Sequence, residues 1–250
     1  MRDDERAVSD VVAFVLVFAV IIGSVGLISV TAFSSMESLQ EGEQMKNAER
    51  GVGALADNFN DVLRYDAIEE RSGELSLREG TVRTGSDSPT VNVTVWDEDG
   101  VTSNETTLGQ FTYERGGTTI AYEGGGVFRG QDGGDVLLER PQIKCEDGGA
   151  AVVSLVAIDA DQRSLQSHDG QEFTVVEDRE HPNRTAETFT DDVENVTVTV
   201  EGTDFENGWE SVFSDWGEDD EERTWDDGNE EWSCEADRVT VRIVVVDLEF

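Results

Sequence analysis

The two cysteines are the residues of this chain whose chemistry is easiest to specify. Cys145 and Cys234 are its only cysteines, and His168 and His181 are its only histidines. One intrachain disulfide is the cross-link that the cysteines permit, if the domain lies in an oxidising compartment. A structural zinc site needs about four Cys or His ligands, and no CxxC or HxxxH spacing occurs here. A disulfide is therefore permitted, and no zinc site is expected.

Four N-x-Ser/Thr sequons offer N-glycosylation, a modification of asparagines on outer surfaces. Each sequon alone is a weak signal, because a chain rich in Asn, Ser and Thr contains some by chance. Asn92 and Asn195 lie at the edges of predicted strands, whereas Asn104 and Asn183 lie between predicted strands. Asn104 and Asn183 are therefore the better candidates.

Motifs for catalysis are absent from the sequence, which contains no G-x-S-x-G, S-x-x-K, H-E-x-x-H or Walker A pattern. Residues 124–126 and 133–134 are glycines without the strand-to-helix setting of a phosphate loop, so they are interpreted as turns. Residues 97–100 and 219–222 crowd carboxylates together but do not match an EF-hand loop, and the first is more typical of a hairpin turn. We expect neither an enzyme nor a cofactor nor a metal site.

The charge balance restricts the partners of this chain. It has 56 acidic residues against 18 Lys and Arg, a formal net charge of −38. Charges at this density repel one another unless salt screens them. Nucleic acids and anionic lipid headgroups are therefore not expected as partners of the outer domain. Only Lys46 and Lys144 are lysines, and this Arg-biased, acidic composition resembles that of haloarchaeal proteins.

A long apolar segment near the N-terminus predicts a transmembrane helix, with membrane lipid as its partner. No charged residue occurs from Val11 to Phe33, and a helix of this length spans roughly 34 Å at about 1.5 Å per residue. The hydrocarbon core of a bilayer is about 30 Å thick. A secretory signal peptide is the alternative. Its apolar region is shorter, about 7 to 15 residues, although Val30, Thr31 and Ala32 have the pattern of a signal-peptidase site.

Basic residues near the ends of this segment predict its orientation. Arg2 and Arg6 precede it, and Lys46 is the first basic residue after it. Lys and Arg near a transmembrane helix are found preferentially on the cytoplasmic side. The N-terminus is therefore expected in the cytoplasm and the C-terminal domain outside the cell.

The N-terminal sequence DDERAVSDVVAFVLVFAVIIGS resembles the class III signal peptide of archaeal type IV pilins. In that family a short charged leader ends in a basic residue followed by Ala or Gly, and prepilin peptidase cleaves it before the apolar helix. Arg6 and Ala7 match these positions. The resemblance implies cleavage between Ala7 and Val8, or else between Arg6 and Ala7, and self-association or contact with other pilin subunits through the helix. Asp10 stands where haloarchaeal pilins commonly have proline, which weakens the case for a major pilus subunit.

The resemblance extends beyond the leader. Residues 53–85 and 124–145 are similar to a haloarchaeal family of pilin-like membrane proteins. That family implies no activity, cofactor or ligand for this chain.

A helix is expected to continue beyond the membrane. Apolar residues recur at spacings of three and four at Met45, Ala48, Val52, Leu55, Phe59 and Val62. This seam either packs on the chain's own outer domain or contacts other subunits. The first alternative is favoured for the extracellular half, and self-assembly for the membrane half. Gly42, Gly51 and Gly53 each weaken a helix by about 1 kcal/mol, which predicts a break or kink near residues 42 to 53.

From Gly73 onward, short alternating runs bounded by Gly, Asp and Asn predict β-strands. The expected strands are Glu74–Arg83, Thr90–Trp96, Gln110–Glu114, Thr118–Tyr122, Val136–Leu138, Val152–Ile158, Glu172–Val176, Val196–Val200 and Val239–Leu248. Alternate residues of the last two strands place one face inward, and the apolar Val152–Ile158 is typical of a central strand. The predicted fold is α+β, a long N-terminal transmembrane helix followed by a mainly antiparallel β-sandwich or meander.

Residues 203–235 combine dense acid with the tryptophans Trp209, Trp216, Trp225 and Trp232. We expect a short helix from Glu206 to Trp216, followed by an acidic loop. The tryptophans are expected to cover a sheet edge, and an aromatic face that binds a sugar or a protein partner is the alternative. A disulfide from Cys234 to Cys145 would tie this segment to the middle of the sheet.

Four parts are expected in the chain. They are a prepilin-type leader (1–7), a transmembrane and assembly helix (8–35), a helical extension (36–72) and an acidic β-rich extracellular domain (73–250). The predicted function is that of a pilin-like single-pass protein of the haloarchaeal cell surface, a minor or accessory subunit for filament assembly or adhesion. The alternative is an uncleaved anchored domain that binds a ligand or partner through its Trp-rich segment. An anchored extracellular enzyme ranks last.

Overall fold

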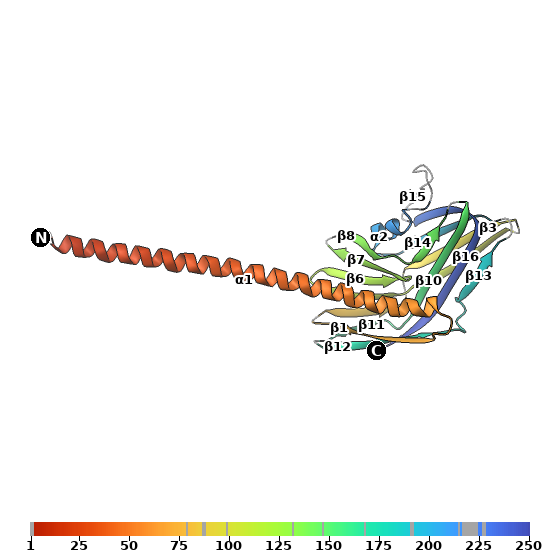
Figure 1. The fold of residues 1–250 in the computed structure, drawn as a ribbon, viewed down its shortest axis with the longest axis horizontal. Helices are drawn as coiled ribbons and strands as arrows, with labels where there is room; N and C mark the ends of the chain where they lie inside the picture. The colour runs from red at the N-terminus through yellow and green to blue at the C-terminus, as the bar shows by residue number, and fades with distance from the viewer. Residues whose placement is uncertain are drawn as a thin grey trace. The chain divides into compact units, whose positions relative to one another are not determined.

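The computed structural model describes residues 3–78, 80–86, 89–98, 100–131, 133–146, 148–167, 169–190, 193–214, 216, 225–226 and 229–250. The chain divides into two compact units, Met1–Asn47 and Ala48–Phe250. Helix α1 (Asp3–Arg64) forms the described part of the first unit and begins the second. Strands β1 to β16 and the short helix α2 (Glu206–Val212) follow (Figure 1).

The second unit is a β-rich domain with two sheets, and the predicted fold class of a long helix followed by a mainly antiparallel β-domain is confirmed. The strands are β1 (Glu70–Ser76), β2 (Thr81–Gly85), β3 (Thr90–Asp97), β4 (Gly100–Thr107), β5 (Gln110–Arg115), β6 (Thr118–Glu123), β7 (Gly126–Gln131), β8 (Gly134–Glu139), β9 (Gln142–Cys145), β10 (Gly149–Asp159), β11 (Arg163–Gln166), β12 (Gly170–Glu177), β13 (Thr185–Phe189), β14 (Val193–Glu201), β15 (Trp225–Asp226) and β16 (Asn229–Glu249).

Strand β16 organises the larger, 10-stranded sheet, whose order is β1-β12-β16-β14-β3-β4. Its first part pairs antiparallel with β14, and its later residues pair antiparallel with β13 and then β12. From Ala236 to Asp247 it also pairs with β10, in parallel. Strand β10 is bordered by β9 on its other side, so the predicted central position of Val152–Ile158 is confirmed. In Figure 1, β16 lies between β10 and β13.

The smaller sheet has the order β11-β2-β5-β6-β7-β8, and its pairings are antiparallel. Strands β5 to β8 follow one another through tight hairpins. Their turns contain Gly116, Gly117, Gly124, Gly125 and Gly133, all with positive φ, a conformation that costs glycine little. The interpretation of the glycine runs at 124–126 and 133–134 as turns is confirmed.

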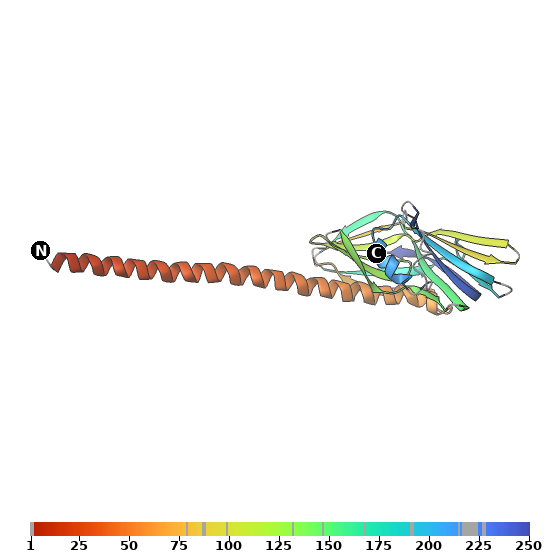
Figure 2. The same ribbon diagram turned by 90° about the horizontal axis from the view of Figure 1, so that it is seen from above.

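The core forms where alternate strand residues face each other. Val196, Val198 and Val200 on β14 are buried, as are Val239, Val241, Ile243 and Val245 on β16, which confirms the predicted inward faces. Ala121 and Phe128 of the smaller sheet belong to the same hydrophobic cluster. Both sheets therefore contribute to one core. The last turns of α1 run alongside the sheets (Figure 2).

Three expectations about the elements are wrong. The predicted strand Glu74–Arg83 is two strands, β1 and β2, which belong to different sheets. Helix α1 continues without a break to Arg64, and β1 begins at Glu70, so the expected break near residues 42 to 53 is absent and the helical extension is shorter than predicted. Helix α2 ends at Val212, before the expected end at Trp216. The predicted acidic loop at 217–224 lies outside the described residues.

A disulfide joins β9 to β16, the strand on which the larger sheet is built. Cys145 and Cys234 are linked, with their Cα atoms 6.1 Å apart and 89 residues apart in sequence. The link ties the Trp-rich segment to the larger sheet, as its sequence position suggested.

Removing this disulfide is expected to destabilise the domain. Closing a loop of this length restricts the unfolded chain, and loss of such a link costs about 2 to 4 kcal/mol. The Cys145→Ser/Cys234→Ser double variant should therefore unfold at lower denaturant concentration than the oxidised protein and match the reduced wild type. Equal midpoints for the oxidised protein and the double variant would contradict this expectation.

Candidate functional site

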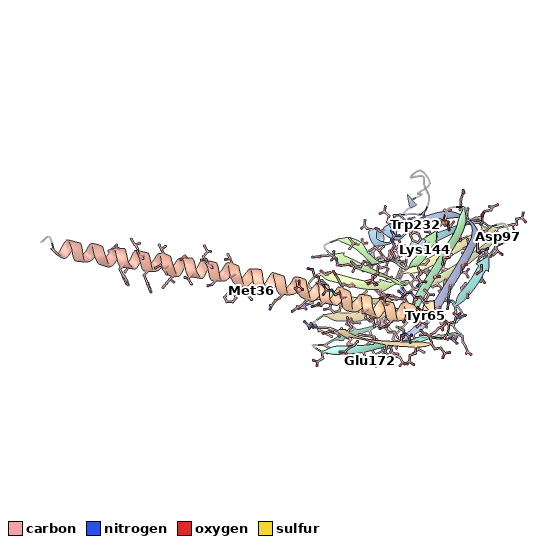
Figure 3. All side chains as sticks on the ribbon, in the orientation of Figure 1. Met36, Tyr65, Asp97, Lys144, Glu172 and Trp232 are labelled. Carbon is pink, nitrogen blue, oxygen red and sulfur yellow. A yellow bond between two sulfur atoms is a disulfide. The ribbon has the colours of Figure 1, made fainter. Side chains whose placement is uncertain are left out.

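The most prominent candidate site is the apolar stretch of α1. Val12–Phe33 has 22 residues with a mean hydropathy of 2.7, and none of it is buried. A helix of this length spans about 33 Å at about 1.5 Å per residue, close to the thickness of a bilayer core. The side chains of this stretch, and Met36 beyond it, project from a bare helix (Figure 3). The stretch is long and apolar enough to be a single-pass membrane anchor or a signal sequence.

The hydroxyl groups of Ser24 and Thr31 in this stretch are satisfied within the helix. Ser24 Oγ donates to the carbonyl oxygen of Ile21 at 2.8 Å. Thr31 Oγ1 lies 3.1 Å from the Leu27 carbonyl and 3.0 Å from the Ile28 carbonyl. Because lipid offers no hydrogen-bond partners, a spanning helix must satisfy its own polar groups. These side chains meet that requirement.

The predicted processing site lies in the first turns of the same helix. Arg6, Ala7 and Val8 fall within the bounds of α1, which begins at Asp3. Their side chains lie outside the part of the chain that the structure describes. Cleavage beside Ala7 stays a prediction.

The other end of α1 is anchored in the β-domain by the predicted seam. Val52, Leu55, Phe59 and Val62 are at most 2% exposed. The ring of Phe59 meets Phe111 of β5 edge-on, with the ring centroids 6.0 Å apart, and it meets Tyr122 of β6 edge-on at 5.3 Å. For residues 48–62, the prediction that the seam packs on the chain's own domain is therefore confirmed.

A buried hydrogen-bond network fixes the orientation of α1 at this apolar contact. Asn60 Nδ2 donates to the Gly125 carbonyl at 2.9 Å, and the Tyr122 hydroxyl donates to Asn60 Oδ1 at 2.9 Å. Burial raises the pKa of Tyr122 well above its usual value, so its hydroxyl stays a donor. Asn60 follows the seam residue Phe59 in sequence, and the apolar pattern gave no sign of this role.

Glycines on α1 allow the close packing of this helix end. A Cβ at Gly51 would lie 2.8 Å from Leu75 of β1, and one at Gly53 would overlap the Glu139 carboxylate. The expected break of the helix does not occur, because Gly51 and Gly53 serve packing and tertiary contacts outweigh their low helix propensity. Arg129 of β7 also reaches α1, where Nη1 lies 2.8 Å from Glu49 Oε1.

Three tryptophans of the Trp-rich segment are part of the core. Trp209, Trp216 and Trp232 are at most 6% exposed. Phe213 stacks on Trp232 with the ring centroids 4.1 Å apart, and Trp232 lies beside α2 in Figure 3. These three rings cover the sheet, as predicted, and offer no aromatic face to a ligand. The side chain of Trp225 lies outside the described residues.

A buried carboxylate supports α2. Glu123 at the end of β6 is 3% exposed, and its Oε2 accepts hydrogen bonds from Trp209 Nε1 at 3.0 Å and Thr203 Oγ1 at 2.9 Å. Desolvation raises the pKa of Glu123 to about 7, against the lowering effect of these two hydrogen bonds. This side chain was not singled out in the sequence, because acidic residues are numerous there.

The four sequons differ in their secondary structure and in their exposure to solvent. Asn183 is exposed in the turn before β13. Asn92, Asn104 and Asn195 lie within β3, β4 and β14, and Asn92 Oδ1 accepts a hydrogen bond from Ser103 at 2.6 Å. The expected position of Asn104 between strands is wrong, because it pairs with Val93 within the edge strand β4 and its Nδ2 is buried. Glycosylation of each of the four stays a prediction, and the exposed Asn183 is the most accessible of them.

The remaining candidate ligands and catalytic side chains do not gather into a site within the described ranges. Within the described ranges, no group of three or more His, Cys, Asp or Glu side chains is placed to hold a metal ion. His181 Nε2 lies 3.6 Å from Asp159 Oδ2, and His168 lies outside the described residues. Residues 97–100 lie at the hairpin between β3 and β4, where the Gly100 amide donates to Asp97 Oδ1 at 3.0 Å, as predicted for a turn.

Fold and site together define a class of protein, one with a single N-terminal apolar helix followed by a mainly antiparallel β-domain. The chain belongs to DUF7289, a family of unknown function, whose pattern matches residues 6–250. Comparison with curated proteins and with solved structures finds no significant match.

Truncation of Phe59 is expected to weaken the attachment of α1 to the domain. Phe59→Ala removes a fully buried ring, a change that costs about 3 to 5 kcal/mol. Phe33→Ala is the matched control, because it removes the same side chain from the same helix at a position that is 73% exposed. Denaturant unfolding of the full chain in detergent micelles should show a large loss of unfolding free energy for Phe59→Ala alone. A similar loss of unfolding free energy in both variants would contradict the packing of Phe59 against β5 and β6.

Glu123 is expected to make stability depend on pH. Its pKa is about 7 in the folded chain and ordinarily about 4.3, so the folded state binds the extra proton. The stabilisation is present below about pH 4 and is lost as pH rises through about 7, by up to about 4 kcal/mol.

The Glu123→Gln variant isolates this effect, because glutamine keeps an acceptor for Trp209 and does not titrate. The difference in unfolding free energy between wild type and variant should change between about pH 4 and pH 8. A constant difference over this range would contradict the assignment.

Proposed function

We propose that this protein is a pilin-like, single-pass protein of the cell surface and a minor or accessory subunit for filament assembly or adhesion. In this proposal prepilin peptidase removes the leader beside Ala7 on the cytoplasmic side. The apolar stretch Val12–Phe33 lies in the membrane and packs against helices of other subunits. The acidic β-domain faces a salt-rich extracellular medium, as in a haloarchaeon.

One observation carries the proposal: the apolar stretch is part of a continuous helix whose last turns belong to the domain core. Val12–Phe33 and the buried residues Val52 to Val62 lie on the same helix, α1. An ordinary secretory signal is removed from the domain it exports, and cleavage after Ala32 would cut α1 in the middle. A helix that is both an apolar membrane segment and part of the outer domain is what a pilin-type subunit requires.

The disulfide and the distribution of charge support an extracellular domain. Disulfides persist mainly in oxidising compartments, and Cys145 and Cys234 are joined. Arg2 and Arg6 precede the apolar stretch, and Lys46 follows it only after a long interval, which favours a cytoplasmic N-terminus. The uncleaved anchor that binds a ligand through its Trp-rich segment is less favoured, because Trp209, Trp216 and Trp232 are buried.

Helix-to-helix contact in the membrane can be tested with single introduced cysteines. Val15→Cys, Leu16→Cys, Val17→Cys and Phe18→Cys sample the whole circumference of the helix at 3.6 residues per turn. The native cysteines are already joined, so only the introduced thiol can react. On oxidation of native membranes, a cross-linked dimer is expected at one or two adjacent faces. Asn183→Cys, on an exposed turn of the domain, is the control.

Absence of a cross-link at all four helix positions would contradict assembly and would favour a solitary anchor. Cross-linking of the Asn183→Cys control to the same extent would indicate random collision in the membrane.

A further inference from the structure

A polar groove crosses the face of the smaller sheet opposite to α1. Its volume is about 760 Å³, within the usual range of about 300 to 1,000 Å³ for ligand sites. On β5, Phe111 and Tyr113 alternate with Thr112 and Glu114. Phe111 lies on the side of Phe59, so Thr112 and Glu114 face the groove.

The floor of the groove is a row of residues in register across four adjacent strands. Glu114 of β5 lies opposite Thr119 of β6, Thr119 opposite Gly130 of β7, and Gly130 opposite Asp135 of β8. All four line the groove. Neighbouring strands are about 4.8 Å apart, a spacing comparable to the length of one sugar unit in a linear glycan. A chain laid across the strands would thus meet polar side chains on β5, β6 and β8.

The charges in the floor are already paired. Arg83 Nη1 lies 3.1 Å from Glu114 Oε1. Asp135 Oδ1 accepts from the Gly208 amide at 2.6 Å, and Asp135 Oδ2 accepts from Asn207 Nδ2 at 2.7 Å. The groove therefore presents hydrogen-bonding groups without a strong field of one sign. An anionic ligand would in addition be repelled by the net charge of −38.

The segment before α2 forms one wall of the groove, and Asp204 and Phe205 both line it. Phe205 is only 4% exposed and packs over Gly130, where a Cβ would lie 3.2 Å from Phe205 Cε1. The ring therefore closes this side of the groove, and the groups left for a ligand are the polar side chains of the strands.

We propose that this groove binds a neutral, hydroxyl-rich glycan chain that lies across the strands. A peptide that lies across the strands is a poorer fit, because β5, β6 and β7 in the floor are each paired on both edges and cannot accept an added strand. The inference does not depend on the proposed filament function. Binding requires the folded domain, whereas cleavage and assembly require the N-terminal segment, so one can fail while the other holds.

The test uses the full chain in detergent micelles at high salt, titrated calorimetrically with neutral hexasaccharides. The probes are hexamers of β-1,4-glucose, α-1,4-glucose, β-1,4-N-acetylglucosamine and α-1,6-mannose. We expect saturable binding of at least one hexamer. Thr119→Trp, which fills the middle of the groove, should weaken that binding at least tenfold. Thr94→Trp is the matched control, since Thr94 is a half-buried threonine in the middle of β3 in the other sheet.

Circular dichroism and the unfolding midpoint establish that both tryptophan variants are folded. A Thr119→Trp chain that does not fold is replaced by Gln131→Ala and Gln110→Ala, which remove amide groups at two positions of the groove. The proposal is overturned if no neutral hexamer binds, or if the groove variants bind as tightly as Thr94→Trp. Binding of a sulfated hexasaccharide or an unstructured peptide in preference to every neutral hexamer would also overturn it.

Discussion

Pairing along β16 is the constraint on which the rest of the domain depends. This strand runs from Asn229 to Glu249 and pairs with β10, β12, β13, β14 and β15. Its alternate residues Val239, Val241 and Ile243 are buried, so the same strand supplies both the hydrogen-bond framework and the centre of the core. A one-residue slip would place this face in solvent and disturb every partner at once.

The end of α1 is the second constraint, and it connects the domain to the proposed membrane function. Phe59 lies between Phe111 and Tyr122, and Asn60 fixes the rotation of the helix by its bonds to Tyr122 and Gly125. Beyond this anchored end, Val12–Phe33 is entirely exposed. Exposed apolar surface on this scale requires a covering environment. In the proposed function lipid or neighbouring helices supply it, and the buried end keeps the β-domain on the same helix.

Sequence periodicity predicted the regular parts of this structure. The seam from Ala48 to Val62 and the alternation on β14 and β16 depend on local spacing, which a single sequence displays. The parallel pairing of β10 with β16 and the split of Glu74–Arg83 into two sheets depend on contacts between distant residues, which spacing does not encode. The prediction of a helix break failed for the same reason, because Gly51 approaches Leu75 of β1. The polar groove depends on register between strands and was invisible in the sequence.

The central claim is that α1 begins as a processed pilin-type membrane helix. The measurement that tests it most directly is the N-terminal sequence of the protein purified from its native membrane. A start at Val8, or at Ala7, is the predicted result and would establish prepilin-peptidase cleavage. An intact Met1 would contradict the pilin-like account in favour of a plain membrane anchor, and a start at Phe33 would contradict both, because it would mean that the domain is secreted.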